Sequence, residues 1–214
     1  MHAKLVACTS VCGEGVPKLG SCEDLVAYCA RVSNPSNQMN TDTSGKLISY
    51  LKTHNHWSPF EMVHIVLEVH TTRDIARQLL RHRSFTFQEF SQRYATVAAV
   101  EPVLREARVQ DSKNRQNSIQ VDDEALQREW EQRQTEAWKA CNEAYAWALE
   151  SGIAKEVARC VLPEGLTPST LYVSGSLRSW MHYVSVRTDP STQREHRELA
   201  EACAAAIRPK FSLI

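Results

Sequence analysis

Three arginines, Arg73, Arg77 and Arg81, stand four residues apart, so a helix would place them on one face. Like charges at this spacing destabilise a helix by a few tenths of a kcal/mol per pair, and something should offset that repulsion. Guanidinium groups are planar donors that can bind a phosphate, or the carbonyl edge of a base, through two hydrogen bonds. The face could therefore bind an anionic ligand, or it could be an ordinary solvated face whose side-chain stems cover the core edge.

The segment after these arginines is rich in side chains that bind phosphate or base edges. Arg81, His82 and Arg83 close the expected helix. The segment 84–94 then supplies Thr86, Gln88, Glu89, Ser91, Gln92 and Arg93. A helix C-terminus repels anions, so the arginines must provide the attraction. The pattern indicates a nucleotide-binding cage without identifying the nucleotide.

A nucleic-acid-binding protein that uses the segment 73–93 as a phosphate clamp is the alternative function. Lys and Arg together number 25, as do Asp and Glu, so no net field attracts a polynucleotide. The chain also lacks a basic run, which argues against this class. We therefore expect no nucleic-acid partner.

The composition bounds the remaining classes. A chain of 214 residues, 43% of them hydrophobic, suits one globular domain with a real core. No apolar stretch is long enough to span a bilayer, and the N-terminus lacks a secretory signal. The seven cysteines are scattered, which favours reduced thiols and a cytoplasmic location. Neither Cys8 with Cys12 nor His64 with His70 completes a metal-ligand set, so we expect no metal.

The elements that must position the polar segment follow from hydrophobic periodicity. Strands are expected at 4–9, 63–69 and 170–174. Helices are expected at 21–30, 46–53, 72–82, 123–151, 153–161, 176–186 and 193–208. Thr192 and Glu195 have the spacing of a capping box for the last helix. These elements predict a single α+β domain, an antiparallel or mixed sheet flanked by long helices.

The stretch 104–123, polar from residue 110 onward, is expected to be a surface loop or insertion. Its basic residues would then form a solvated surface or border a substrate entrance; they are Arg105, Arg108, Lys113 and Arg115. On the long helix that follows, Trp130 and Trp138 are expected to lie in the core or a subunit interface.

Arg81-His82-Arg83, followed after seven residues by Ser91, matches the RHR-x7-S signature of flavin-dependent thymidylate synthases. The wider run RHRSFTFQEFSQRY is similar to that family's RHRxxSxNExSxRY. Three more segments resemble family elements in the same order: HWSPFE (56–61), ARCVLP (158–163) and SGSLRSWMHYVSVR (174–187). The resemblance runs from about residue 50 to the C-terminus, and 104–150 matches only loosely. The chain is thus identified as resembling this family.

The resemblance implies a homotetramer whose active sites lie where subunits meet. Matched to the family's motifs, the residues expected to contact dUMP are Gln78, Leu79, Leu80, Arg81, Glu89, Phe90, Ser91, Gln92, Arg93, Arg159 and Arg187. Arg159 would come from another subunit, and Arg187 matches the family's activating arginine. The residues expected to contact FAD are His56, Ser58, Arg81, His82, Arg83, Glu89, Ser176, Leu177, Arg178 and His182.

The implied reaction is the reductive methylation of dUMP to dTMP. The carbon donor is 5,10-methylenetetrahydrofolate, reduced FAD supplies the hydride, and NADPH regenerates the flavin. The Cys-His nucleophile of conventional thymidylate synthases is missing, and Cys160 is expected to pack in the core. In its place a fixed guanidinium favours the N3-ionised, electron-rich pyrimidine.

The chain departs from the family pattern at three places. Gln88 stands where the family often has Asn, which keeps an amide. Ser176 stands where Asn usually precedes x-Arg, so an amide expected to bind the cofactor is lost. Ser191 and Thr192 replace a common His-Ala, which removes a further cofactor contact. None of these changes touches Arg81, Ser91, Arg93 or Arg187.

Overall fold

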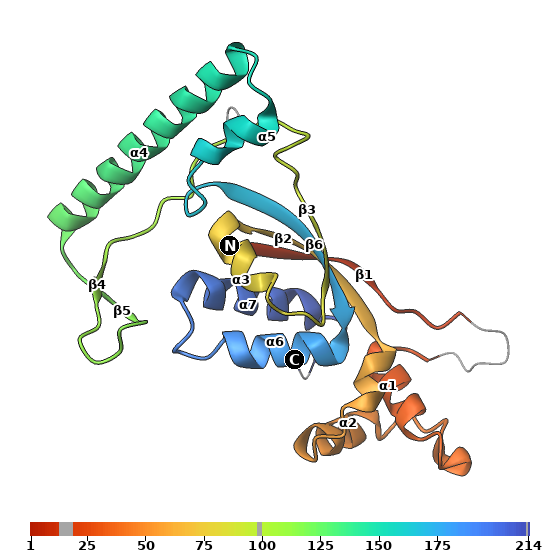
Figure 1. Ribbon diagram of the computed structural model, residues 1–214. Helices are drawn as coiled ribbons and strands as arrows, with labels where there is room; N and C mark the ends of the chain where they lie inside the picture. The colour runs from red at the N-terminus through yellow and green to blue at the C-terminus, as the bar shows by residue number, and fades with distance from the viewer. Residues whose placement is uncertain (13–18, 98–99, 213) are drawn as a thin grey trace.

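Four antiparallel strands form the sheet at the centre of the molecule (Figure 1). The computed structural model describes residues 1–12, 19–97, 100–212 and 214. In order across the sheet, the strands are β1 (His2–Cys8), β2 (His64–Thr72), β6 (Pro168–Ser176) and β3 (Thr86–Glu89). The longest pairing joins β2 to β6, from His64 opposite Ser176 to Thr72 opposite Pro168. The expectation of an antiparallel or mixed sheet is confirmed, and all three strand pairs are antiparallel.

The two faces of the sheet differ because side chains alternate along each strand. Ile65, Leu67 and Val69 of β2 are fully buried, and they face the core beneath the sheet. That core is covered by α6 (Leu177–Arg187) and α7 (Arg194–Ile207), with α3 (Arg73–Leu79) beside them (Figure 1). The opposite face carries polar side chains such as Glu68 and Tyr172, which hydrogen-bond to each other at 2.9 Å. The sheet is therefore buried on one side only within the described chain.

The N-terminal helices lie at one end of the sheet (Figure 1). They are α1 (Cys22–Ala30), the short η1 (Pro35–Asn37), α2 (Ser44–Thr53) and the short η2 (Ser58–Met62). Val26, Ile48 and Phe60, one from each of α1, α2 and η2, are fully buried in the same core as the sheet. This packing places the HWSPFE segment against the start of α6.

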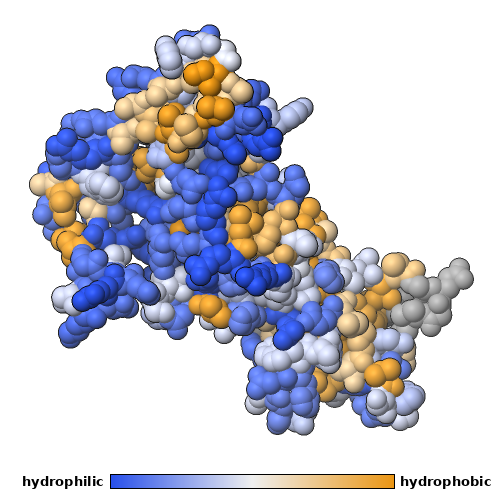
Figure 2. All heavy atoms as spheres, in the orientation of Figure 1, coloured by the Kyte–Doolittle hydropathy of each residue, from blue (hydrophilic) through white to orange (hydrophobic). Residues whose placement is uncertain are grey.

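The 27-residue helix α4 (Glu124–Glu150) stands apart from the sheet (Figure 1). Either Asp122 or Asp123 could cap this helix from the sequence, and the structure shows that Asp123 does so by accepting a hydrogen bond from the amide of Leu126. Its C-terminal half packs in a second core with α5 (Lys155–Ala158) and η3 (Arg159–Val161), and hydrophobic residues also lie at the surface over this end of the molecule (Figure 2). Trp138 is buried, whereas Trp130 and Trp147 are 43% and 64% exposed, so much of the helix has no packing partner within the described chain.

The stretch 104–123 divides into two parts. Residues 104–108 lie half-buried beside α4, and the hairpin of β4 (Arg108–Gln110) and β5 (Ser118–Gln120) is largely exposed. Gln127 and Gln134 of α4 hold the first part through its backbone: Gln134 accepts from the amide of Arg105 at 2.8 Å, and Gln127 accepts from that of Ala107 at 2.7 Å. The basic residues at its start are therefore not a solvated surface.

Several expected elements end elsewhere. Helix α3 stops at Leu79 rather than at residue 82, because the amides of Arg81 and His82 donate to carbonyls three residues back and tighten the chain into a turn. The strand β3 was missed, since four residues give too little periodicity. The single helix expected at 153–161 is the short α5 followed by η3.

The capping box expected at the start of α7 is wrong. Helix α7 begins at Arg194 after Gln193, and the described structure shows no side chain capping it. The hydroxyl of Thr192 instead donates to the carbonyl of Val186, and the carboxylate of Glu195 is used by Gln193 and Arg108. No helix in the described part of the chain has the length and apolar character to cross a bilayer.

Candidate active site

Arg187, the last residue of α6, meets His82 in the turn after α3. Its Nε donates a hydrogen bond to Nε2 of His82 at 2.9 Å. Burial, together with the charges of Arg187, His182 and Arg81, lowers the pKa of His82 to about 4, so its imidazole is neutral near pH 7. Among the described residues no carboxylate forms an ion pair with Arg187. Its positive charge is therefore held in place without being neutralised.

A second neutral imidazole lies behind the first. His196 of α7 is fully buried, and burial, Arg187 and His82 lower its pKa to about 3. The rings of His82 and His196 lie 6.4 Å apart, and Tyr183 packs edge-on against His82 at 5.0 Å. These aromatic side chains close the inner side of the Arg187 site.

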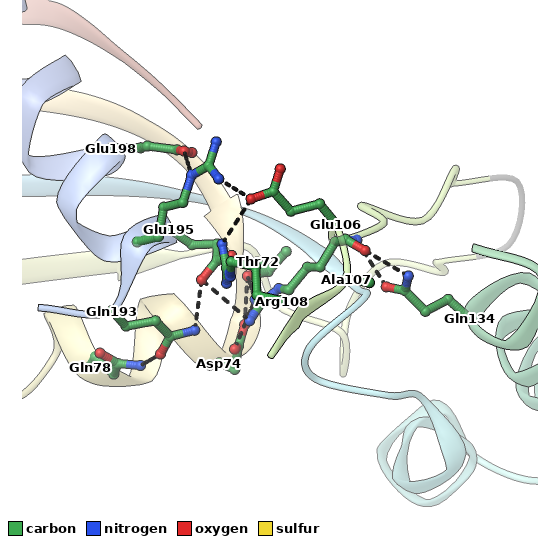
Figure 3. Close-up of polar contacts among 12 residues, drawn as sticks. Thr72, Asp74, Gln78, Glu106, Ala107, Arg108, Gln134, Gln193, Glu195 and Glu198 are labelled. Carbon is green, nitrogen blue, oxygen red and sulfur yellow. Dashed lines mark hydrogen bonds and ion pairs between the residues drawn. The ribbon is translucent and has the colours of Figure 1, made fainter. Parts of the chain in front are cut away.

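Gln78, expected to contact dUMP, lies in a hydrogen-bond chain drawn partly in Figure 3. Its Nε2 donates to Oε1 of Gln193 at 2.7 Å, and its Oε1 lies 3.1 Å from Nδ1 of His196. Gln193 in turn donates to Glu195 at 2.9 Å, and Glu195 is paired with Arg108. No sequence pattern pointed to Gln193 or His196.

The three arginines spaced along one helical face have different partners. Arg73 is buried and lies 3.2 Å from Glu89, which also accepts a hydrogen bond from Ser169. Arg77 is exposed and pairs with Glu164 at 2.9 Å. Arg81 is exposed and forms no ion pair among the described residues. Acidic neighbours thus offset the repulsion for two of them, and only Arg81 keeps its charge available.

Ser91 and Arg93 lie beside the turn that precedes α5. They line an open cavity of about 520 Å³ together with Tyr94, Ala154, Lys155 and Glu156. Arg93 is within 3.2 Å of Glu156, and both side chains are exposed. Arg159 follows at the start of η3 and is half-buried. Of the remaining expected dUMP contacts, Leu79 and Gln92 are buried, Leu80 is half-buried and Phe90 is exposed.

Two of the expected cofactor residues, Arg178 and His182, line a cavity beside α6. A cavity of about 560 Å³ is lined by Lys52, Trp57, Ser84, Arg178, Ser179, Met181, His182, Val184, Ser185 and Ile214. Arg178 also pairs with Glu61 of the HWSPFE segment at 2.9 Å, a contact that the sequence did not predict. Cationic, hydroxyl and aromatic side chains in one cavity fit a dinucleotide with a pyrophosphate and flat rings. His56, Ser58 and Arg83 are exposed and do not line this cavity.

Ser176 explains one departure from the family pattern. Its side chain is buried and caps α6 by accepting a hydrogen bond from the amide of Ser179 at 3.3 Å. It also bonds to Glu61, and this bond, followed by that of Arg178, lowers the pKa of the Glu61 carboxyl. Ser and Asn are equally good helix N-caps, so Ser176 keeps the local structure that Asn would form. Leu177 is buried beside it.

Within one chain, the expected residues therefore fall into three groups. His82 contacts Arg187, and Gln78 is linked to them through His196. Ser91 and Arg93 line a cavity with Glu156, and Arg178 and His182 line the cavity beside Trp57. Among the described residues, no hydrogen bond or ion pair joins the sites of Arg81, Arg93, Arg159 and Arg187 to one another.

The cysteines differ from expectation at one position. Cys160 is exposed in η3, so its expected place in the core is wrong. Sγ of Cys8 lies 2.8 Å from Sγ of Cys22 rather than beside Cys12. Within the described residues, no group of three or more His, Cys, Asp or Glu side chains could hold a metal ion.

Comparisons with known proteins find relatives that match most of the chain. The family model described as "Thymidylate synthase complementing protein" matches residues 18–211. A "probable flavin-dependent thymidylate synthase" of Paramecium bursaria Chlorella virus 1 is 49% identical over 214 residues, which cover 100% of this chain and 97% of the relative. A "flavin-dependent thymidylate synthase" of Synechocystis sp. is 50% identical over 192 residues, 90% of this chain and 87% of the relative. Among solved structures, the UMP/dUMP methylase PolB of Streptomyces cacaoi, bound with 5-Br dUMP, superposes with a TM-score of 0.81 and 29% identity over 97% of this chain and 90% of that one.

Proposed function

Since the chain belongs to the family of flavin-dependent thymidylate synthases, we propose that it converts dUMP to dTMP by reductive methylation. The carbon donor is 5,10-methylenetetrahydrofolate, and FAD with NADPH supplies the reducing power. The names of the relatives and the dUMP analogue in the Streptomyces cacaoi enzyme support this reaction.

The observation that carries the proposal is that the guanidinium of Arg187 is held by His82 and, among the described residues, has no carboxylate partner. Carbon 5 of uracil must become nucleophilic, and loss of the N3 proton makes the ring electron-rich. A guanidinium group with no carboxylate partner stabilises that anion more than a paired one would, because its charge is not already neutralised. The neutral His82 acceptor fixes Nε of Arg187 and leaves the terminal nitrogens of the guanidinium for the uracil oxygens.

The remaining cations would hold the phosphate and sugar. Arg81 and Arg93 are exposed, and Ser91 lies beside Arg93 at the open cavity near α5. Arg159 would join them from another subunit. Glu89 is already fixed by Arg73 and Ser169, so it can present its free lone pairs to a ligand in a defined direction.

The cavity at the start of α6 would hold FAD. Arg178 would bind the pyrophosphate, and Trp57 and His182 would contact the flat rings. When bound there, the flavin supplies the hydride that completes the methyl group. The protein's contribution is orientation: Ser176 fixes the start of α6, and Glu61 fixes Arg178.

We further propose that the enzyme is a homotetramer. The separation of the site into three groups within one chain supports shared active sites. Exposed apolar side chains on α4, namely Leu126, Trp130 and Trp147, also suit a contact between subunits. The unpaired cysteines fit a cytoplasmic location.

The alternative, a phosphate clamp for nucleic acid, is not favoured. Three of the five arginines in the segment 73–93 are paired with carboxylates: Arg73 with Glu89, Arg77 with Glu164 and, at the surface, Arg93 with Glu156. A clamp would need those charges for phosphates.

The deciding experiment measures tritium release from 5-tritiated dUMP. Purified protein is assayed with FAD, methylenetetrahydrofolate and NADPH, and again with each left out. We expect release and dTMP formation only in the complete mixture. No dTMP from the complete mixture, together with salt-sensitive binding of polynucleotide, would overturn the proposal.

A further inference from the structure

The carboxylate of Glu195 fixes which group donates and which accepts in each hydrogen bond around Gln78. Glu195 is buried and paired with Arg108. Burial alone would raise the pKa of Glu195, but its bonds from Gln193 and Arg108 lower it, so the group is a carboxylate and can only accept. Gln193 must therefore turn its amide nitrogen toward Glu195 and its oxygen toward Gln78 (Figure 3).

The orientation of the Gln193 amide determines that of the Gln78 amide. Because Gln193 offers an oxygen, Gln78 must donate with Nε2 and turn its own oxygen toward His196. His196 must then carry its proton on Nδ1. A flipped Gln78 amide would set two oxygens against each other at Gln193 and two donors against each other at His196. The flipped amide would lose both bonds.

We propose that Gln193 and His196 are positioning residues that hold the Gln78 amide in the single orientation that meets the nucleotide. One N–H and one oxygen lone pair of Gln78 are left for that ligand. Gln78 is half-buried, so these remaining groups can be reached. The inference rests on the proposed function in one respect, because it takes dUMP as the ligand of Gln78.

The hydrogen-bond chain from Gln78 to Glu195 is anchored to residues of the stretch 104–150, which matches the family only loosely. Arg108 pairs with Glu195, and Arg105 lies between Glu195, at 3.9 Å, and Asp74 of α3, at 2.8 Å. Gln134 of α4 bonds to both the amide and the carbonyl of Arg105 at 2.8 Å. The segment 104–108 thus fixes the carboxylate that sets the direction of every bond up to Gln78.

The test uses variants that keep side-chain size and remove hydrogen bonding. Gln193→Met removes the acceptor for Gln78, His196→Phe removes the donor, and His196→Asn restores a donor near the Nδ1 position. Gln132→Met, an exposed residue on α4, is the matched control. For each, one measures the Kd of dUMP, the Kd of FAD, KM and kcat for dUMP methylation, and the urea midpoint.

Loss of one such bond is worth about 1 kcal/mol, so Gln193→Met and His196→Phe should raise the Kd and KM of dUMP about fivefold. The Kd of FAD should stay within about twofold of wild type, and His196→Asn should recover part of the loss. An unchanged Kd for dUMP in both variants overturns the inference. So does an equal loss of dUMP and FAD affinity, because that marks a general structural defect. Failure of the proposed function differs: the wild-type protein itself would then neither bind nor methylate dUMP.

Discussion

Arg187 donates its Nε proton to a histidine rather than to a carboxylate: Nε2 of His82 lies 2.9 Å away. The donor is fixed as the arginine, so His82 must carry its own proton on Nδ1. Burial and neighbouring cations keep this imidazole neutral. The contact orients the guanidinium and leaves its charge intact.

Replacing Arg187 should abolish methylation while the cofactor stays bound. Removal of one preorganised charge-stabilising group typically costs about 10²–10³-fold in kcat. We expect Arg187→Ala to lose dTMP formation by at least that factor, with FAD absorbance after gel filtration unchanged. Arg208→Ala, at an exposed arginine just after α7, serves as the control. Turnover close to wild type in Arg187→Ala would refute the role assigned to this residue.

Acid should destabilise the protein through its buried histidines. The ordinary histidine pKa is 6.5, whereas the folded values are about 4 for His82 and about 3 for His196. Between about pH 6.5 and pH 4 the unfolded chain therefore binds more protons. The free energy of unfolding should be highest above this window and fall as the pH drops through it.

Urea unfolding at pH 7 and pH 5 measures this loss. The loss of unfolding free energy between pH 7 and pH 5 should be smaller in His196→Phe than in the wild type, because phenylalanine cannot take up the proton. In His54→Gln, which replaces an exposed histidine, the loss should equal that of the wild type. An equal loss in wild type and His196→Phe would show that His196 is not protonated on unfolding.

Because Ser176 caps α6, two substitutions at this position should affect the free energy of unfolding differently. Ser176→Ala removes the acceptor for the amide of Ser179 and should lower the free energy of unfolding by about 1 kcal/mol. Ser176→Asn keeps a cap and should preserve both stability and the Kd of FAD. Ser112→Ala, exposed in the β4–β5 hairpin, is the control for urea unfolding. A Ser176→Asn protein that binds FAD much more tightly would mean that an amide here does contact the cofactor.

Two arginines on the same helix should differ in their effect on stability. Arg73→Met leaves Glu89 without its partner in a largely buried setting, which should cost about 3 kcal/mol. Arg77→Met breaks an exposed pair with Glu164 and should cost less than about 1 kcal/mol. Urea unfolding of the two variants compares them directly. Equal losses would contradict the different burial of the two pairs.

Cys160→Ser should leave the reaction running. The thiol is exposed in η3, and the proposed mechanism activates uracil through Arg187 without a cysteine. Tritium release and dTMP formation should both stay within about twofold of wild type, since exposed substitutions away from such features have small effects. A folded but inactive Cys160→Ser protein would restore the thiolate mechanism.

The sequence predicted the sheet and most helices because their periodicities are long. The alternation from Val63 to Val69 and the cap at Asp123 are local signals, and both appear in the structure. The strand β3 exists because it pairs with the distant β6, which a local pattern could not reveal. The early end of α3 comes from local turn bonds that hydrophobic periodicity does not report. The capping box at Thr192 failed for a related reason: Glu195 is recruited by Arg108, 87 residues away in the sequence.

For the site, the motifs named the residues but not their partners. His82 and Arg187 were each expected to contact a ligand, and nothing in their spacing showed that they would contact each other. The same holds for Gln78 with Gln193 and for Arg178 with Glu61. At Ser176, where the family usually has an amide expected to bind the cofactor, the structure shows an interior helix cap.

The continuous pairing of β2 with β6 separates two groups of site residues within one chain. Nine paired residues span ~27 Å, with Arg159 and Ser91 near the Pro168 end of β6 and Arg178 just beyond Ser176 at the other. In the proposed tetramer, a chain would give Arg159 to a neighbouring site and keep Arg178 in its own proposed flavin cavity. Arg159→Ala and Arg178→Ala, each expected to be inactive alone, should then complement each other when co-expressed, because some mixed sites would contain only intact parts.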